Sequence, residues 1–170
     1  MIGKVYNIPP QPPVADRNRL LPAGVLTFGV EYRSVDPESL RATYEDNDEH
    51  LAELDARSPE GGFFDTGVSI HVCGTADGRE YLRFDVFDDE PHYHYIHRTT
   101  DGSVVNQVID FDRVANGDML RWVIDLLRTR LAEMLRAAGG ELLAAQLDPL
   151  ALDPVIEQIA AHAEQALRSS

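Results

Sequence analysis

Four segments rich in β-branched and aromatic residues follow one another along the middle of the chain, and turn-forming sequences separate them. The first and last connections contain the pair Asp-Gly, which is a strong signal for a β-hairpin when it lies between such segments. We therefore predict an antiparallel β-meander. Its strands are Thr66–Cys73, Arg79–Phe87, His92–Arg98 and Ser103–Phe111.

A further strand and several helices are predicted on either side of the meander. The segment Val25–Arg33 has strand composition and is expected to join one edge, which gives a sheet of four to five strands. Capping residues and amphipathic spacing predict helices at 37–55, about 118–138, 141–146 and from Pro154 onward. Residues 24–170 are thus predicted to form a single α+β domain with its helices packed on one face of the sheet.

Prolines are concentrated in residues 1–23, at positions 9, 10, 12, 13 and 22. Proline has no N–H group to donate to a sheet ladder or to a helix. We therefore predict an extended arm of polyproline type, which is neither strand nor helix. It is expected to pack on its own domain or on a second subunit.

The chain is strongly acidic, with 15 Lys and Arg against 29 Asp and Glu and a formal charge of −14. Such a charge repels phosphate backbones and anionic membranes, so nucleic acid and membrane are not expected as partners. The sequence shows one cysteine, no secretory leader and no apolar run of the ~18–20 residues that cross a bilayer. We expect a cytoplasmic protein, and the preference for arginine over lysine together with abundant alanine favours a bacterial source.

Matching the apolar faces of the strands predicts how they pair, because a shift of one residue would turn every side chain to the other face. The first and last hairpins are expected to have three-residue turns, and the middle connection, Asp88–Pro91, has four residues. The predicted opposite pairs are His71 with Arg83, Asp85 with His94, and His92 with Asp110.

Alternation along these strands divides their side chains between two faces. One face is apolar and is expected to pack against the helices. The other collects histidines, aromatic residues, an arginine and carboxylates, and this mixture is typical of a pocket or a dimer interface. Its members are Ser69, His71, Cys73, Tyr81, Arg83, Asp85, Phe87, His92, His94, Asn106 and Asp110.

Two histidines and two carboxylates on this polar face form a candidate metal site. His92 and His94 point to the same side of one strand, while Asp85 and Asp110 lie on the two neighbouring strands. Two imidazoles with a carboxylate suit Fe(II), Zn(II) or Mn(II). One divalent ion held by these four residues would activate water or polarise a substrate oxygen.

The same face also suits acid–base chemistry without a metal. Asp85 would orient His94 as a general base, and Tyr81 would donate a proton. Residues expected to contact a ligand, with the guanidinium holding an anionic group, are Arg83, His71 and Asn106. A purely structural role is a third interpretation, because His–Asp pairs across neighbouring strands stabilise sheets without any further function.

Two classes of function therefore remain open. The first is an enzyme or binder that holds a small molecule at the His/Asp-lined face. The second is a non-catalytic homodimeric interaction protein that uses the β face or the acidic helix 37–55. The first requires a cavity on which the polar groups converge. The second requires that this face is flat or covered by another chain.

Overall fold

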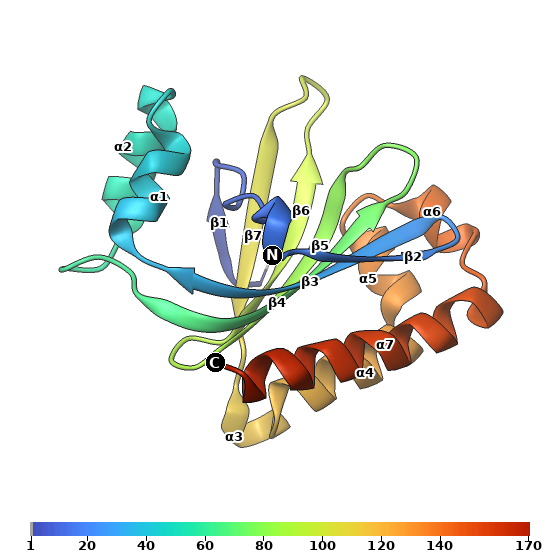
Figure 1. The fold of residues 1–170 in the computed structure, drawn as a ribbon. Helices are drawn as coiled ribbons and strands as arrows, with labels where there is room; N and C mark the ends of the chain where they lie inside the picture. Colours follow the sequence, from blue (N-terminus) through green and yellow to red (C-terminus); the bar gives the residue numbers. More distant parts are fainter. Residues whose placement is uncertain (1) are drawn as a thin grey trace.

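The fold is a seven-stranded antiparallel sheet with helices on both of its sides, as seen in a computed structural model that describes residues 2–170 (Figure 1). The order of the strands across the sheet is β1-β7-β6-β5-β4-β3-β2. The predicted α+β class is confirmed, but the predicted number of four to five strands is too low. The strands are β1 Lys4–Tyr6, β2 Arg19–Ala23, β3 Leu26–Val35, β4 Asp65–Gly74, β5 Glu80–Phe87, β6 His92–Arg98 and β7 Val104–Asp110.

The two additional strands come from the proline-rich arm, which was predicted to contribute none. β1 pairs with β7 at one edge of the sheet, and β2 pairs with β3 at the other. Pro22 is compatible with β2 because an edge strand needs hydrogen bonds on one side only. Between β1 and β2 the arm crosses from one edge of the sheet to the other, so residues 2–23 belong to the same folded unit as the rest of the described chain.

The predicted helices are found close to their predicted positions, with three differences, and the short helix α3, Arg113–Asn116, is additional. The segment 37–55 forms two helices, because Asn47 caps a new one by accepting a hydrogen bond from the backbone N–H of His50 at 3.0 Å. The segment 118–138 divides at Arg130, whose φ of −128° is not helical. The last helix begins after Asp148 and contains Pro154. The helices are α1 Pro37–Tyr44, α2 Asp48–Arg57, α3 Arg113–Asn116, α4 Met119–Thr129, α5 Leu131–Ala137, α6 Glu141–Ala145 and α7 Pro149–Arg168.

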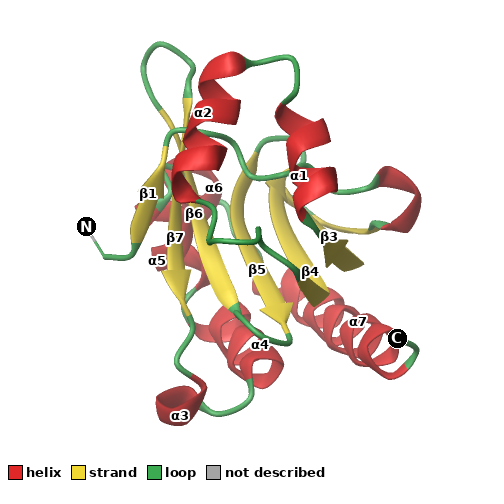
Figure 2. Cartoon of the chain, turned by 90° about the vertical axis from the view of Figure 1, so that its left-hand side faces the viewer, coloured by secondary structure: helices red, strands yellow, loops and turns green. Residues whose placement is uncertain are grey.

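The main core lies between the sheet and the C-terminal helices. Helix α7 contacts β2, β3 and β4, while α4 and α5 contact β5. Figure 2 shows α4 and α7 below the sheet, where their apolar stripes cover its apolar face. The sheet residues at the centre of this core are fully buried, among them Val68, Ile70, Leu82 and Phe84.

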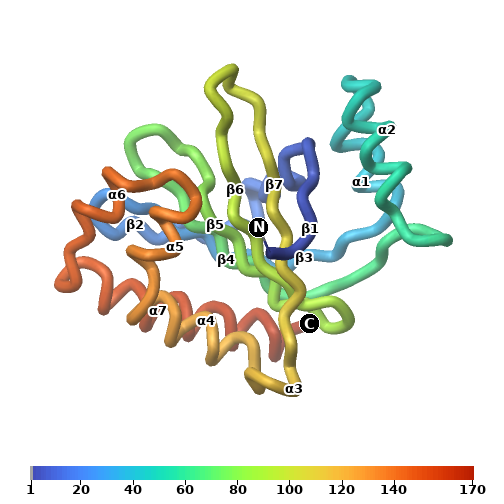
Figure 3. The backbone as a smooth tube through the Cα atoms, turned by 180° about the vertical axis from the view of Figure 1, so that it is seen from behind, coloured from blue at the N-terminus to red at the C-terminus, as the bar shows by residue number. Residues whose placement is uncertain are grey.

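The prediction that all helices pack on one face is wrong for α1 and α2. Seen from behind in Figure 3, this helical pair stands apart from α4 and α7, on the other side of the sheet. Side chains from both helices line a cavity together with polar residues of β5 and β6. The polar face is therefore covered by the protein's own arm and its own helical pair. Among the helices described for residues 2–170, none combines the length and apolar character needed to cross a bilayer.

Candidate functional site

The polar face of the sheet borders a cavity of about 360 Å³. Its floor is formed by side chains of β5, β6 and β7, and its walls by the N-terminal arm, by α1 and α2, and by the segment that follows α2. The floor includes Arg83, Asp85, His92, His94 and Asn106. A concave site with converging polar groups is the arrangement that the small-molecule interpretation requires.

The pairing of β5 with β6 differs from the predicted register by two residues. Asp85 lies opposite His92, and Arg83 lies opposite His94. The connection still comprises Asp88–Pro91, but Val86 and Phe87 before it pair only with β4. Asp65, at the start of β4, accepts hydrogen bonds from the backbone N–H groups of Asp89 and Glu90 at 3.1 and 2.7 Å. A shift of two residues keeps every side chain on its predicted face. The other predicted pairs, His71 with Arg83 and His92 with Asp110, are confirmed.

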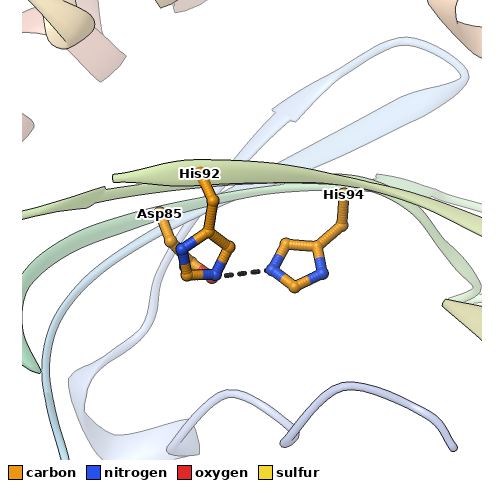
Figure 4. A group of neighbouring side chains, drawn as sticks. All are labelled: Asp85, His92 and His94. Atoms are coloured by element: carbon orange, nitrogen blue, oxygen red, sulfur yellow. Dashed lines mark hydrogen bonds and ion pairs between the residues drawn. The ribbon is translucent and has the colours of Figure 1, made fainter. Parts of the chain in front are cut away.

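Asp85, His92 and His94 form a compact group, which we call the His–Asp–His cluster (Figure 4). One carboxylate oxygen, Oδ2 of Asp85, lies 3.2 Å from Nε2 of His92 and 2.9 Å from Nε2 of His94. One donor atom from each of the three residues lies within 4.8 Å of the other two. The imidazoles come from alternate positions of β6, so both reach the cavity side of the strand.

Each residue of the cluster makes a second hydrogen bond, through the atom that does not take part in the contact within the cluster. Nδ1 of His92 lies 2.6 Å from the carbonyl oxygen of Glu90, and Nδ1 of His94 lies 2.7 Å from Oδ1 of Asn106. Because these oxygens accept, both Nδ1 atoms donate, and each neutral imidazole then presents a lone pair at Nε2. Ser69 donates to the second oxygen of Asp85. Two Nε2 lone pairs facing one carboxylate repel it unless a proton or a metal cation lies between them.

Burial and charge move the pKa values of the cluster in different directions. Burial lowers the pKa of His94, and the nearby carboxylate of Asp85 does not fully offset this. Burial also opposes a charge on His92, but the hydrogen bond and the charge of Asp85 outweigh it and raise the pKa. Burial would raise the pKa of Asp85, yet its close contacts with the two imidazoles hold it well below its usual range.

A second group of buried charges lies beside the cluster, and we call it the arginine–glutamate network. It consists of Glu31, Arg33, His71, Glu80 and Arg83. Arg83 donates from Nε and from one terminal nitrogen to the two oxygens of Glu80, each at 2.8 Å. His71 lies with its Nδ1 2.6 Å from Glu80 and its Nε2 3.9 Å from Glu31. Only the two arginines of this network line the cavity.

The network also fastens the arm across the polar face. The backbone carbonyl of Gln11 accepts hydrogen bonds from Arg83 at 2.8 Å and from Arg33 at 3.2 Å. The side-chain amide of Gln11 accepts from Arg33 and donates to Thr43 of α1. Tyr44 of α1 donates to the carbonyl of Pro9 at 2.6 Å. These contacts hold the arm and α1 in place as part of the cavity wall.

The structure brings together part of the predicted site. Asp85, His92 and His94 meet as expected. Asp110 lies at the rim with its side chain 75% exposed and pairs with Lys4 at 3.6 Å, so it does not join the predicted ligand set.

Tyr81 donates to Asp77 at 3.0 Å and packs into the helix-side core, away from the cavity, so its predicted role as proton donor does not fit. The irregular pairing between Val72 and Cys73 turns this end of β5.

The three predicted ligand contacts have different positions. Arg83 lines the cavity, with Glu80 and Gln11 as its partners. Asn106 also lines it, and its oxygen holds His94. His71 is 1% exposed and lies within the network, outside the cavity wall. The structure therefore does not place His71 where it was predicted to contact a ligand.

Sequence reasoning missed the polar residues of β3 and of the arm. Glu31 and Arg33 alternate with Val30 and Tyr32, so the period of two would have assigned them to the polar face. The long segment between β3 and β4 gives no register, and the pairing of Glu31 with Ser69 was not derivable from it. Gln11 carries no sequence signal, because its role depends on where the arm crosses the sheet.

Comparison with known proteins gives a family and no function. A family model described as Domain of unknown function (DUF7700) matches residues 20–163. This is most of the chain, and the chain therefore belongs to that family. No curated protein and no solved structure matches it. The matched range contains the His–Asp–His cluster, while most of the arm lies before it.

Proposed function

We propose that this DUF7700 domain holds one divalent transition-metal ion at Asp85, His92 and His94 and uses it to bind a small molecule in the cavity. The observation that carries the proposal is the direction of the imidazoles. Both Nδ1 atoms are committed as donors, and both Nε2 atoms face the same carboxylate oxygen. A cation bound by all three groups removes the repulsion between these lone pairs and the carboxylate.

The spacing of the donor atoms suits such an ion. Metal–ligand bonds of roughly 2.0–2.2 Å allow two donors that share an ion to lie about 3 Å apart. The contacts of 2.9 and 3.2 Å in the cluster agree with this. Two histidines and one carboxylate occupy three positions on one side of the metal and leave others for water or substrate. Fe(II), Zn(II) and Mn(II) are the candidates.

The surrounding residues are those expected to support a metal centre. Histidine ligands generally donate their second nitrogen to a carbonyl or carboxylate, which fixes the tautomer. Here the carbonyl of Glu90 and the amide oxygen of Asn106 have this role, and Ser69 orients Asp85. When bound, the ion would supply Lewis acidity toward a substrate oxygen or an activated water. The cavity above the cluster supplies the space for the substrate.

Metal content tests the proposal directly. Untagged protein, reconstituted in turn with Fe(II), Zn(II) and Mn(II) and then freed of excess ion, is analysed for its elements. We expect about one ion per chain, lost when His92→Ala and His94→Ala are combined. His97→Ala is the matched control, since His97 lies on the same strand but outside the cluster. Protein that retains no stoichiometric ion, or a double variant that retains it, would contradict the proposal.

Metal-free acid–base catalysis is the second candidate, and a specific observation favours it. The pKa of His92 is raised and that of His94 is lowered, although both contact the same carboxylate. Histidines whose pKa values are moved apart suit one acid and one base in a single reaction. Absence of metal binding in the experiment above, with ligand binding retained, would favour this candidate.

The homodimeric interaction protein has less support. It was predicted from a polar face left open, and that face is covered by the arm and by α1 and α2 of the same chain. The acidic surface of α1 and α2 has no observation that identifies a partner. The dimer therefore stays a prediction, which sedimentation of the purified protein would test.

A further inference from the structure

The cavity wall that faces the His–Asp–His cluster is largely apolar. Tyr6 and Ile8 come from the arm, Tyr44 from α1, Leu54 from α2, and Phe63 from the segment before β4. Four separate parts of the chain thus place aromatic or branched aliphatic side chains opposite the polar floor. A ligand that fills this space gains free energy from the burial of an apolar body, in addition to any contact with the floor.

The charge of the floor favours one negative charge on the ligand. Arg83 is paired with Glu80, and Arg33 lies 3.3 Å from Glu31, so these buried charges offset one another. Asp85 is the remaining buried carboxylate at the cavity, because Glu90 and Asp110, which also line it, are exposed and water screens their charges. A divalent ion on the cluster therefore leaves the floor with net positive charge. A ligand with one anionic oxygen group neutralises it at short range.

A phosphate dianion is not favoured by this arrangement. The cationic side chains of the described lining already have partners, which reduces their capacity for a group with several acceptor oxygens. The pairs are Lys4 with Asp110, Arg57 with Glu53, Arg33 with Gln11 and Glu31, and Arg83 with Glu80 and Gln11. A carboxylate needs only the metal and one further donor, so it fits the floor better.

We infer that the ligand of this cavity is a small monocarboxylate with an apolar body, bound with its carboxylate on the metal and its body against the wall of Tyr44, Leu54 and Phe63. The inference rests on the proposed metal site and adds the class of ligand. A volume of about 360 Å³ is at the lower end for small-molecule sites, which limits the body to one ring or a short branched chain.

Calorimetric titration of the Zn(II)-loaded protein with three probes tests the inference. Cyclohexanecarboxylate has both parts of the ligand, acetate lacks the body, and cyclohexylmethanol lacks the carboxylate. We expect cyclohexanecarboxylate to bind at least about 10-fold more tightly than either of the others, because each lacks one of the two sources of affinity. The metal-free protein is expected to lose most of its affinity for cyclohexanecarboxylate.

Two neighbouring phenylalanines provide a matched pair of variants. Phe63 lines the cavity, whereas Phe64 does not and is 62% exposed. Phe63→Ala should weaken the binding of cyclohexanecarboxylate about 10-fold with zinc content unchanged, and Phe64→Ala should leave both unchanged. Retained zinc with equal affinity for acetate and cyclohexanecarboxylate, or with equal effects of the two variants, would overturn the inference and leave the metal site standing. Failure to bind zinc would overturn both.

Discussion

Two groups of buried charged side chains lie next to each other on the same face of the sheet, and they differ in how their polar atoms are paired. In the arginine–glutamate network, charges of opposite sign meet in pairs, and the arginines fasten the arm. In the His–Asp–His cluster, two imidazoles held from behind converge on one oxygen at a cavity. Both contain histidine and carboxylate. What separates them is the partner of each polar atom and the access to a ligand.

The shape of the cavity at the cluster depends on the network, because the network holds part of the cavity wall. The network holds Gln11, and Gln11 in turn holds α1 through Thr43. Between β1 and β2 the arm has no partner strand, so side-chain contacts such as these and the hydrogen bond from Tyr44 to Pro9 attach it above the floor. The structural network thus shapes the cavity in which the cluster would act.

The largest effect is expected from breaking the network. Glu80→Ala removes the partner of a fully buried guanidinium, and loss of one member of a buried ion pair costs about 3–5 kcal/mol. Denaturant unfolding should show this loss in the free energy of unfolding. The double variant Glu80→Ala/Arg83→Leu should be less destabilised than Glu80→Ala alone. If the single variant is as stable as the wild type, the network has no structural role.

An intermediate effect is expected from the support of the cluster. Asn106→Leu cannot accept from Nδ1 of His94, so the tautomer that exposes Nε2 is no longer fixed. Loss of such a partner lowers metal affinity about 10- to 100-fold. Competition with a chelating dye measures the affinity for Zn(II). Asn106→Asp keeps an acceptor at this position and should restore most of it, whereas equal loss in both variants would show that the tautomer is not what matters.

The smallest effect is expected from pH, and it has opposite signs for two carboxylates of the network. Burial raises the pKa of Glu31 above 4.5, so its contribution to stability is present below pH 4.5 and is lost as pH rises through the raised pKa. Burial would also raise the pKa of Glu80, but Arg83 and His71 hold it below 4.5. Its contribution is therefore present above pH 4.5 and is lost as pH falls.

Glutamine variants make this difference measurable. Relative to wild type, Glu31→Gln should become more stable as pH rises above about 4.5, whereas Glu80→Gln should become less stable as pH rises toward about 4.5 from below. Thermal unfolding on both sides of pH 4.5 gives both slopes. Slopes of the same sign would show that the two carboxylates do not differ as the structure indicates.

The polar face could be predicted from the sequence, because alternation and short turns fix which side chains share a side. His71 opposite Arg83 and His92 opposite Asp110 were derived in this way. Which of these side chains contact one another could not be predicted from the sequence. Val86 and Phe87 pair with β4 and not with β6, next to a loop whose backbone donates to Asp65, which is distant in sequence. Lys4, the ion-pair partner of Asp110, comes from the arm.

The arm itself shows why strand prediction failed at both ends of the sheet. Proline marks a segment as unsuited to a central strand, but an edge strand tolerates it, and the sequence does not reveal which strands are edges. Likewise, the period of two along β5 assigns Tyr81 to the polar face, yet the irregular pairing near Cys73 turns its side chain toward the helices. Such local irregularities leave no mark in a pattern of period two.

The central claim is that the cluster binds a metal and the network does not, although both contain buried histidine. Nitrogen NMR of imidazole-labelled protein during titration with Zn(II) tests it most directly. We predict that the Nε2 signals of His92 and His94 shift, with Nδ1 protonated throughout, while both nitrogens of His71 keep their positions. Unchanged signals from His92 and His94 at one equivalent of zinc, or a shift at His71 instead, would contradict it.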